Sequence, residues 1–270
     1  GAASNLLSLR TTKTGSAAKL MLDASAGTQD NTYLNVQDSD ASGGTQLSGG
    51  GSSTDNGNNT NWDLAPTVTI AGSVYSDEGV TGLASKTVAL SISGSTVQVT
   101  AETDAGGYYV ITATGAASSG RVLTLFLRDE TQNAVTVTVG SGTNMTGVHL
   151  YQDRLIIRSN TGSTTTGNSS ALSITELDTA DAVGDSDITA IYTLEDSNAT
   201  LHLAKHKELY IWSGTEFAPG GRVKTHDLQS EGDIQMATHG LTVSGSLVVN
   251  GSGSTATGTF LTGTGATETL

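Results

Sequence analysis

The sequence contains no cysteine, only two prolines and few aromatic or charged residues, which make up 4% and 14% of its 270 positions. Without cysteine the chain has neither a disulfide framework nor thiol chemistry. No stretch approaches the roughly 20 consecutive apolar residues that a membrane-spanning helix requires. We therefore expect a protein without disulfides and without membrane insertion.

Positive charge is also scarce, because 12 lysines and arginines stand against 26 aspartates and glutamates and leave a formal net charge of −14. A nucleic-acid-binding protein needs clustered Lys and Arg to neutralise phosphates, and no such cluster stands out along the chain. An acidic surface suits a soluble extracellular protein or one that collects divalent cations. The composition therefore predicts no nucleic-acid partner, suits an extracellular location and is compatible with a bacterial cell-surface protein.

Small and β-branched residues dominate what is present, with 34 glycines and many Ser and Thr. Apolar residues alternate with polar ones throughout, which predicts an all-β fold. In residues 1–65 the runs LLSLR, AKLMLD and YLNVQD are spaced as short strands stacked in successive coils of a solenoid-like segment. A Gly/Ser/Asn-rich tail follows them and has the composition of a linker, whereas Trp62 at its end indicates packing against a core.

Residues 66–150 show about seven strand-like runs with Gly- and Asp-bearing turns, the pattern of a small β-sandwich. Three features are informative: G-x-V-x-x-D-x-G from Gly72 to Gly79, a strand with Val88 and Leu90, and T-D-x-x-G-x-Y from Thr103 to Tyr109. Together they resemble the carboxypeptidase-regulatory-like or transthyretin-like sandwich of bacterial surface proteins. The resemblance implies a stalk or adaptor without catalytic residues.

Residues 151–270 return to short strands, and GLTVSGSLVVNGSGSTATGTFLTG is typical of a parallel β-solenoid whose coils are stable only when stacked. We expect about 20–25 residues per coil. The whole chain is therefore predicted to be all-β, with parallel solenoid-like segments flanking an immunoglobulin-like or transthyretin-like β-sandwich.

The order of several segments along the chain carries a second resemblance. DSDASGGT and TDNGNNTNW come first, followed after the sandwich by YQDRLIIR, DTADAVGDSDITAIY and LYIWSGTEFAPGG. This order is similar to the repeat unit of very large β-rich proteins that bacteria secrete or carry on their surface. The resemblance implies a structural link in a long polymer and assigns no site residues.

The acidic segment DTADAVGDSD has two interpretations. Calcium prefers several carboxylate oxygens, and Asp178, Asp181, Asp185 and Asp187 are the candidate ligands. The spacing lacks the D-x-D-x-D-G core of an EF-hand loop and its later Glu. We therefore favour a solvated turn whose aspartates cap backbone amides, with calcium as the alternative and no other cofactor.

The segment LYIWSGTEF holds the densest group of aromatic residues, Tyr210, Trp212 and Phe217. Such residues can anchor a partner or a glycan, but a chain with few large side chains also needs them for its core. Core packing is the favoured interpretation, and an interface through Tyr210, Trp212 and Phe217 is the alternative.

No motif in the sequence supports catalysis. His202 and His206 have the i, i+4 spacing of zinc ligands on a helix, but the alternation around them is strand-like and separates them by about 13 Å. No G-x-S-x-G elbow is present. Acids such as Asp185 and Glu195 would serve a polysaccharide-degrading solenoid only if two of them converged in a cleft.

We expect a non-catalytic structural module of an extracellular or cell-surface assembly such as a filament, sheath or surface layer. Strands near both ends, in LLSLR and TFLTGTGATETL, would leave open edges that join neighbouring copies or tandem neighbours in a longer chain. The alternative function is an adhesin or carbohydrate-binding module that contacts glycan through residues 210–217.

Overall fold

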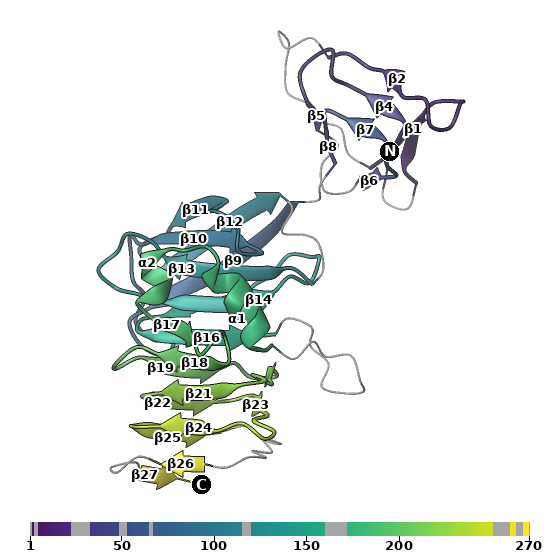
Figure 1. Cartoon of the computed structure of the whole chain (residues 1–270). Helices are drawn as coiled ribbons and strands as arrows, with labels where there is room; N and C mark the ends of the chain where they lie inside the picture. Colours follow the sequence, from purple (N-terminus) through teal and green to yellow (C-terminus); the bar gives the residue numbers. More distant parts are fainter. Residues whose placement is uncertain are drawn as a thin grey trace. The chain divides into compact units, whose positions relative to one another are not determined.

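The computed structural model is all-β, with stacked parallel strands that resemble a β-solenoid (Figure 1). It describes residues 2, 5–22, 33–48, 53–64, 67–114, 120–159, 172–250, 260–262 and 267–269. The chain divides into two compact units. Unit 1 comprises Gly1–Val68 and Ala113–Ser118, and unit 2 comprises Thr69–Thr112 and Ser119–Leu270. In the part of the chain that the structure describes, no helix has the length and apolar character to cross a membrane.

Unit 1 is a short stack of parallel strands in three small sheets, ordered β1-β3-β6, β2-β4-β7 and β5-β8. The strands are β1 (Leu7–Arg10), β2 (Ala18–Lys19), β3 (Leu34–Gln37), β4 (Ser39–Asp40), β5 (Leu47–Ser48), β6 (Thr54–Asp55), β7 (Asn59–Thr60) and β8 (Trp62–Asp63). The runs LLSLR and AKLMLD, expected to stack on each other, lie in different sheets, so one coil contains both. Leu7 pairs with Leu34 of the next coil instead.

The small core of unit 1 contains Leu34, Val36 and Leu64, with Leu9 and Trp62 packed against it. The indole Nε1 of Trp62 donates a hydrogen bond to Ser39 Oγ at 3.0 Å. The described part of the polar tail, residues 53–64, thus forms the last coil of this stack.

Asp38 links equivalent corners of three coils in unit 1. Its side chain is only 3% exposed. Its Oδ2 accepts from the backbone N–H of Gly15 at 3.0 Å, and its Oδ1 accepts from Asn58 Nδ2 at 2.6 Å. The hydrogen bonds from Asn58 and then from Gly15 hold the pKa of Asp38 below its ordinary value. The charged form therefore stabilises the stacking of the coils.

Unit 1 should consequently lose stability in acid. A carboxylate whose pKa is lower in the folded state contributes its full stabilisation above its unfolded pKa of about 3.9. This stabilisation is lost as the pH falls through the folded-state pKa. We expect the melting temperature of unit 1 to be level from about pH 7 to 5 and to fall below about pH 4. Trp62 fluorescence in a Trp212→Phe background measures it, because these are the two tryptophans of the chain.

Asp38→Asn should lower this melting temperature at neutral pH and flatten its acid dependence. Asp40→Asn is the matched control, because the pKa of Asp40 is lowered chiefly by hydrogen bonds from Ser42 within its own turn and only to a smaller extent by the charge of Lys19 in the neighbouring coil. Equal melting curves for the Asp38→Asn variant and the unchanged chain would contradict the role of Asp38.

Unit 2 is organised around a nine-stranded sheet ordered β11-β10-β13-β14-β16-β19-β22-β25-β27. The strands are β10 (Thr87–Ile92), β11 (Val99–Glu102), β13 (Val122–Leu127), β14 (Val135–Val139), β16 (Arg154–Arg158), β19 (Glu208–Ile211), β22 (Asp227–Ser230), β25 (Ser246–Val249) and β27 (Thr267–Thr269). Pairing is antiparallel from β11 to β14 and parallel from β14 to β27.

Three further sheets complete unit 2, ordered β12-β9-β15, β17-β18-β21-β24-β26 and β20-β23. Their strands are β9 (Thr67–Tyr75), β12 (Tyr108–Thr114), β15 (Leu150–Tyr151), β17 (Tyr192–Glu195), β18 (Thr200–Leu203), β20 (Glu216–Phe217), β21 (Arg222–Thr225), β23 (Asp233–Ile234), β24 (Leu241–Val243) and β26 (Phe260–Thr262).

The solenoid part of unit 2 repeats in register. Leu209 pairs with Leu228, and Leu228 pairs with Leu247. Positions 209, 228 and 247 therefore recur at a constant interval, which is slightly shorter than the expected coil length of about 20–25 residues. Each coil places one strand in the sheet of β19, β22 and β25 and one in the sheet of β18, β21 and β24, as the lower part of Figure 1 shows. The leucines of these layers fill a common interior with Val223 and Leu241.

The predicted segments 66–150 and 151–270 share one sheet. β14 pairs in parallel with β16, with Val135 beside Leu155. Every residue of β13 and β14 is buried, because both faces of the sheet are covered there. On one face α1 (Ile174–Asp181) and α2 (Ser186–Thr189) pack against β13, and β15 lies against β14 on the other.

The helices correct the expectation of a turn at residues 178–187. Ser173 and Glu176 form a capping box at the start of α1, where Ser173 Oγ accepts from Thr175 N–H at 3.1 Å and Glu176 Oε2 accepts from Ser173 N–H at 2.7 Å. Ile174, Leu177 and Ala180 form the buried face of this helix. The S-x-x-E motif, together with apolar residues spaced three apart, is a sequence signal for the start of a helix. The sequence interpretation followed the aspartates instead and therefore missed this signal.

Candidate functional site

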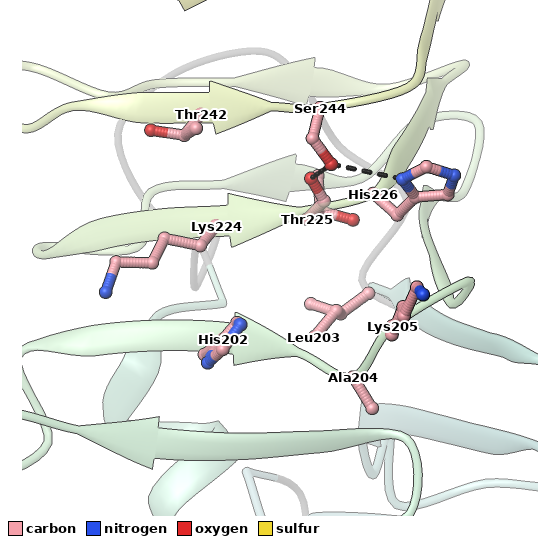
Figure 2. A pocket seen from close by; sticks show the side chains of 9 residues that line it. All are labelled: His202, Leu203, Ala204, Lys205, Lys224, Thr225, His226, Thr242 and Ser244. Atoms are coloured by element: carbon pink, nitrogen blue, oxygen red, sulfur yellow. Dashed lines mark hydrogen bonds between the residues drawn. The ribbon is translucent and has the colours of Figure 1, made fainter. Parts of the chain in front are cut away.

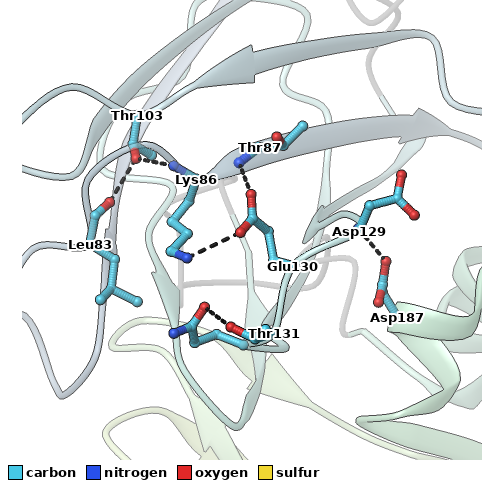
Figure 3. Close-up of polar contacts among 9 residues, drawn as sticks. Leu83, Lys86, Thr87, Thr103, Asp129, Glu130, Thr131 and Asp187 are labelled. Carbon is cyan, nitrogen blue, oxygen red and sulfur yellow. Dashed lines mark hydrogen bonds and ion pairs between the residues drawn. The ribbon is translucent and has the colours of Figure 1, made fainter.

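The acidic segment is held by protein donors (Figure 3). Asp187 Oδ2 accepts from the backbone N–H of Asp129 at 2.7 Å, which ties α2 to the β13–β14 turn. Asp185 is the N-cap of α2 and accepts from the N–H of Asp187 at 3.0 Å, so the expected capping role is confirmed for this residue. Its other oxygen lies 3.8 Å from Arg128 Nε. These carboxylates anchor the helices.

The remaining two aspartates lie in α1. Asp178 Oδ1 accepts from Asn198 Nδ2 at 2.7 Å. Burial, and then the charge of Asp178, raise the pKa of Asp181. Within the described ranges no group of three or more His, Asp or Glu side chains is arranged to hold a metal ion. The structure therefore does not bring Asp178, Asp181, Asp185 and Asp187 together as a calcium site.

The aromatic residues of the segment 210–217 separate onto two sides of the solenoid wall. Phe217 is 0% exposed and belongs to the interior core, where it contributes to the same cluster as Leu172 and Ile174. Tyr210 is 4% exposed and points outward, with Trp212 packed beside it. The sequence grouped three residues that the fold does not keep together.

Tyr210 and Trp212 instead join aromatic residues from distant parts of the chain. The ring of Tyr151 lies 5.5 Å from that of Tyr210, and the ring of His149 lies 5.6 Å from that of Trp212. Tyr75 completes this outer aromatic cluster. The cluster covers Ile156 on the outer face of β16, so the bulk of these rings serves packing.

His149 is held as a neutral ring inside the outer aromatic cluster. Its Nδ1 accepts from the backbone N–H of Ser73 at 3.1 Å. Burial, and then the nearby charge of Arg158, lower its pKa. Arg158 lies over the ring of Trp212 at 5.6 Å. Tyr75, His149 and Tyr151 were missed in the sequence because no local pattern marks residues that meet across such separations.

A third surface is the outer face of the sheet containing β18, β21 and β24 (Figure 2). His202, Lys224 and Thr242 lie side by side in register on successive coils. Three adjoining open depressions of about 420, 430 and 470 Å³ follow this face. The third shares Lys224 with the first and Arg222 with the second. We call the surface lined by His202, Lys205, Arg222, Lys224, His239 and Thr242 the basic face.

Glu195 orders the centre of the basic face. Its Oε1 lies 2.6 Å from His202 Nδ1, and its Oε2 accepts from Lys224 Nζ at 3.1 Å. The hydrogen bonds from His202 and then from Lys224 lower the pKa of Glu195. One carboxylate thus fixes two donors from neighbouring coils.

The histidines differ from the pair considered in the sequence. His202 lies on the basic face, whereas His206 lies at the following corner of the coil with a positive φ of 63°. The ring of His206 lies 5.3 Å from that of His226, one coil further on. His226 Nδ1 is 3.0 Å from Ser244 Oγ, as Figure 2 shows.

Comparison of the chain with protein-family models, with curated proteins and with solved structures finds no match.

Proposed function

We propose that the chain is a non-catalytic structural module of an extracellular or cell-surface bacterial assembly, such as a filament, sheath or surface layer. It would join its neighbours, either separate copies or tandem units of a longer chain, through free strand edges of its stacked coils. The single observation that carries the proposal is the in-register parallel ladder from β16 to β27. A ladder of this kind can continue by adding one coil after another.

The outermost strands of the ladder supply the edges. In the described residues, β27 pairs only with β25 and β26 pairs only with β24. The opposite end of the nine-stranded sheet is different, because the strand pairing is antiparallel there and the sheet ends in β11. Unpaired N–H and C=O groups on an edge are a template for another strand. The parallel pairing at this end of the sheets thus favours the addition of further parallel strands at the β26 and β27 edge.

We further propose that β9 to β15 form the immunoglobulin-like or transthyretin-like sandwich expected from the motifs of residues 72–79 and 103–109. The antiparallel strands β11, β10, β13 and β14 would be one layer, and β12, β9 and β15 the other. Its role would be that of an adaptor which ends the solenoid on one side. We also propose that the chain corresponds to the repeat unit of large surface proteins that its segment order resembles.

The adhesin alternative has less geometric support. Phe217 lies in the interior and Tyr210 is 4% exposed, so Trp212 is the residue of this trio that stays partly accessible. An aromatic platform for a glycan needs exposed ring faces.

Assembly should be visible in solution. We expect sedimentation velocity to show species that grow with protein concentration, and electron microscopy to show linear rows of particles. Thr262→Lys combined with Thr269→Lys should shift the protein to monomers, because lysine on an edge strand opposes strand addition.

The matched control is Thr100→Lys, an exposed position on β11 at the other edge of the nine-stranded sheet, which should assemble like the unchanged chain. A tandem fusion of two copies should melt at a higher temperature than one copy, because the last coil gains a stacking partner. A protein that stays monomeric at high concentration, and whose tandem fusion melts no higher, would contradict the proposal.

A further inference from the structure

We infer that the basic face binds a linear anionic polysaccharide, with carboxylate or sulfate groups, laid along the solenoid axis across β18, β21 and β24. The site is separate from the strand edges and does not rest on the proposed assembly. Arg222, Lys224 and Lys205 supply the positive charge, and hydroxyl and imidazole groups supply further hydrogen-bond donors and acceptors.

The charge of this face is opposite to that of the chain. The chain carries a formal charge of −14 with only 12 Lys and Arg, yet three of these cations line the adjoining depressions. The acidic groups beside them are Glu195, already bound to His202 and Lys224, and Asp196, whose carboxylate accepts from Thr200. In the part of the chain that the structure describes, neither Lys205 nor Arg222 makes an ion pair, and both are exposed.

The spacing of the donors suits a polymer rather than a single small anion. Equivalent positions on adjacent strands are about 4.7–4.9 Å apart. His202, Lys224 and Thr242 therefore form a row of donors with this repeat along the solenoid axis. An extended glycan advances by a similar distance with each sugar, so successive residues of the polymer meet successive coils. The three adjoining depressions provide a continuous track for it.

The chemistry of the lining favours a charged glycan over other polymers. Among the residues that the structure describes, no Trp, Tyr or Phe lines the three depressions, so these residues offer no ring on which a nucleic-acid base or the flat side of a neutral sugar would stack. Threonine and serine residues, whose hydroxyls suit sugar hydroxyls, line the depressions together with the cations instead.

Binding can be measured by calorimetry on the full chain at low salt, with polygalacturonate as the carboxylated probe, dextran sulfate as the sulfated probe and neutral dextran as the reference. We expect at least one anionic probe to bind, neutral dextran not to bind, and added salt to weaken the interaction. The double variant Lys205→Ala with Arg222→Ala should weaken binding by about tenfold. Both positions are exposed, and circular dichroism verifies that the variant is folded.

The matched control removes two exposed lysines from unit 1, as Lys13→Ala with Lys19→Ala, and should bind as the unchanged chain does. The anionic probe that binds more tightly identifies carboxylate or sulfate as the preferred group. Loss of binding in both double variants alike, binding of neutral dextran, binding of single-stranded DNA with equal affinity, or no binding to either anionic probe would each overturn the inference.

Discussion

Replacing Phe217 with alanine is expected to lower the free energy of unfolding of unit 2 by about 3–5 kcal/mol. Phe217 is one of the largest fully buried side chains of the protein and lies in the core cluster that joins the solenoid interior to α1. On β20 it pairs with Ile234 of β23, and its backbone also bridges to Leu172 ahead of α1. Removing the ring leaves a cavity between coils that cannot collapse without breaking their register.

Urea unfolding followed by Trp212 fluorescence measures this effect in a Trp62→Phe background, where the signal comes from unit 2 alone. Tyr108→Ala is the control, because Tyr108 is an aromatic residue of the same unit that is 47% exposed, and we expect a loss below about 1 kcal/mol. If the Phe217→Ala protein were as stable as the Tyr108→Ala control, the core role of Phe217 would be contradicted.

The second large effect is expected for Gly72→Ala, which should lower the free energy of unfolding of unit 2 by about 3 kcal/mol or more. A Cβ at position 72 would overlap the carbonyl oxygen and carbon of Val148 on the neighbouring segment. The obstruction is backbone and cannot rotate away. Hydrogen bonds on either side, from Ala71 N–H to Met145 O at 2.9 Å and from Val148 N–H to Ala71 O at 3.0 Å, hold the two segments at this distance.

Gly106→Ala is the matched control, because the nearest atom to its added Cβ is Asp104 Oδ1 at 3.5 Å, an ordinary contact. Gly72→Ala should also disturb the outer aromatic cluster, since the adjacent Ser73 N–H orients His149. The emission of Trp212, which packs on His149, should therefore change in the folded state. Unchanged emission and a stability equal to that of Gly106→Ala would contradict this account of the junction.

The local alternation of apolar and polar residues was sufficient to predict the strands, but local composition led to a wrong prediction where the helices lie. The segment GLTVSGSLVV was predicted to contain short solenoid strands, and the structure places β24 and β25 there. Leu241 and Val243 of β24 are buried, because a strand places successive side chains on opposite faces. Residues 178–187 were predicted as a turn because their aspartates dominated the composition. The capping box of Ser173 and Glu176 and the buried spacing of Ile174 and Leu177 carried the opposite and correct information.

The sequence by itself thus determined that the chain is all-β, where most short strands lie and that the later strands stack as a solenoid. These properties depend on the period of apolar residues and on turn-forming glycines, which are local. Only the tertiary structure decided which strands pair, including the parallel pairing of β14 with β16. It also placed Phe217 in the interior core and Tyr210 in the outer aromatic cluster. It also decided that Lys205, Arg222 and Lys224 gather on one face of an acidic protein. Pairing between strands arises from backbone hydrogen bonds that carry no residue identity, so the partners follow from the packing of the whole core rather than from any one segment.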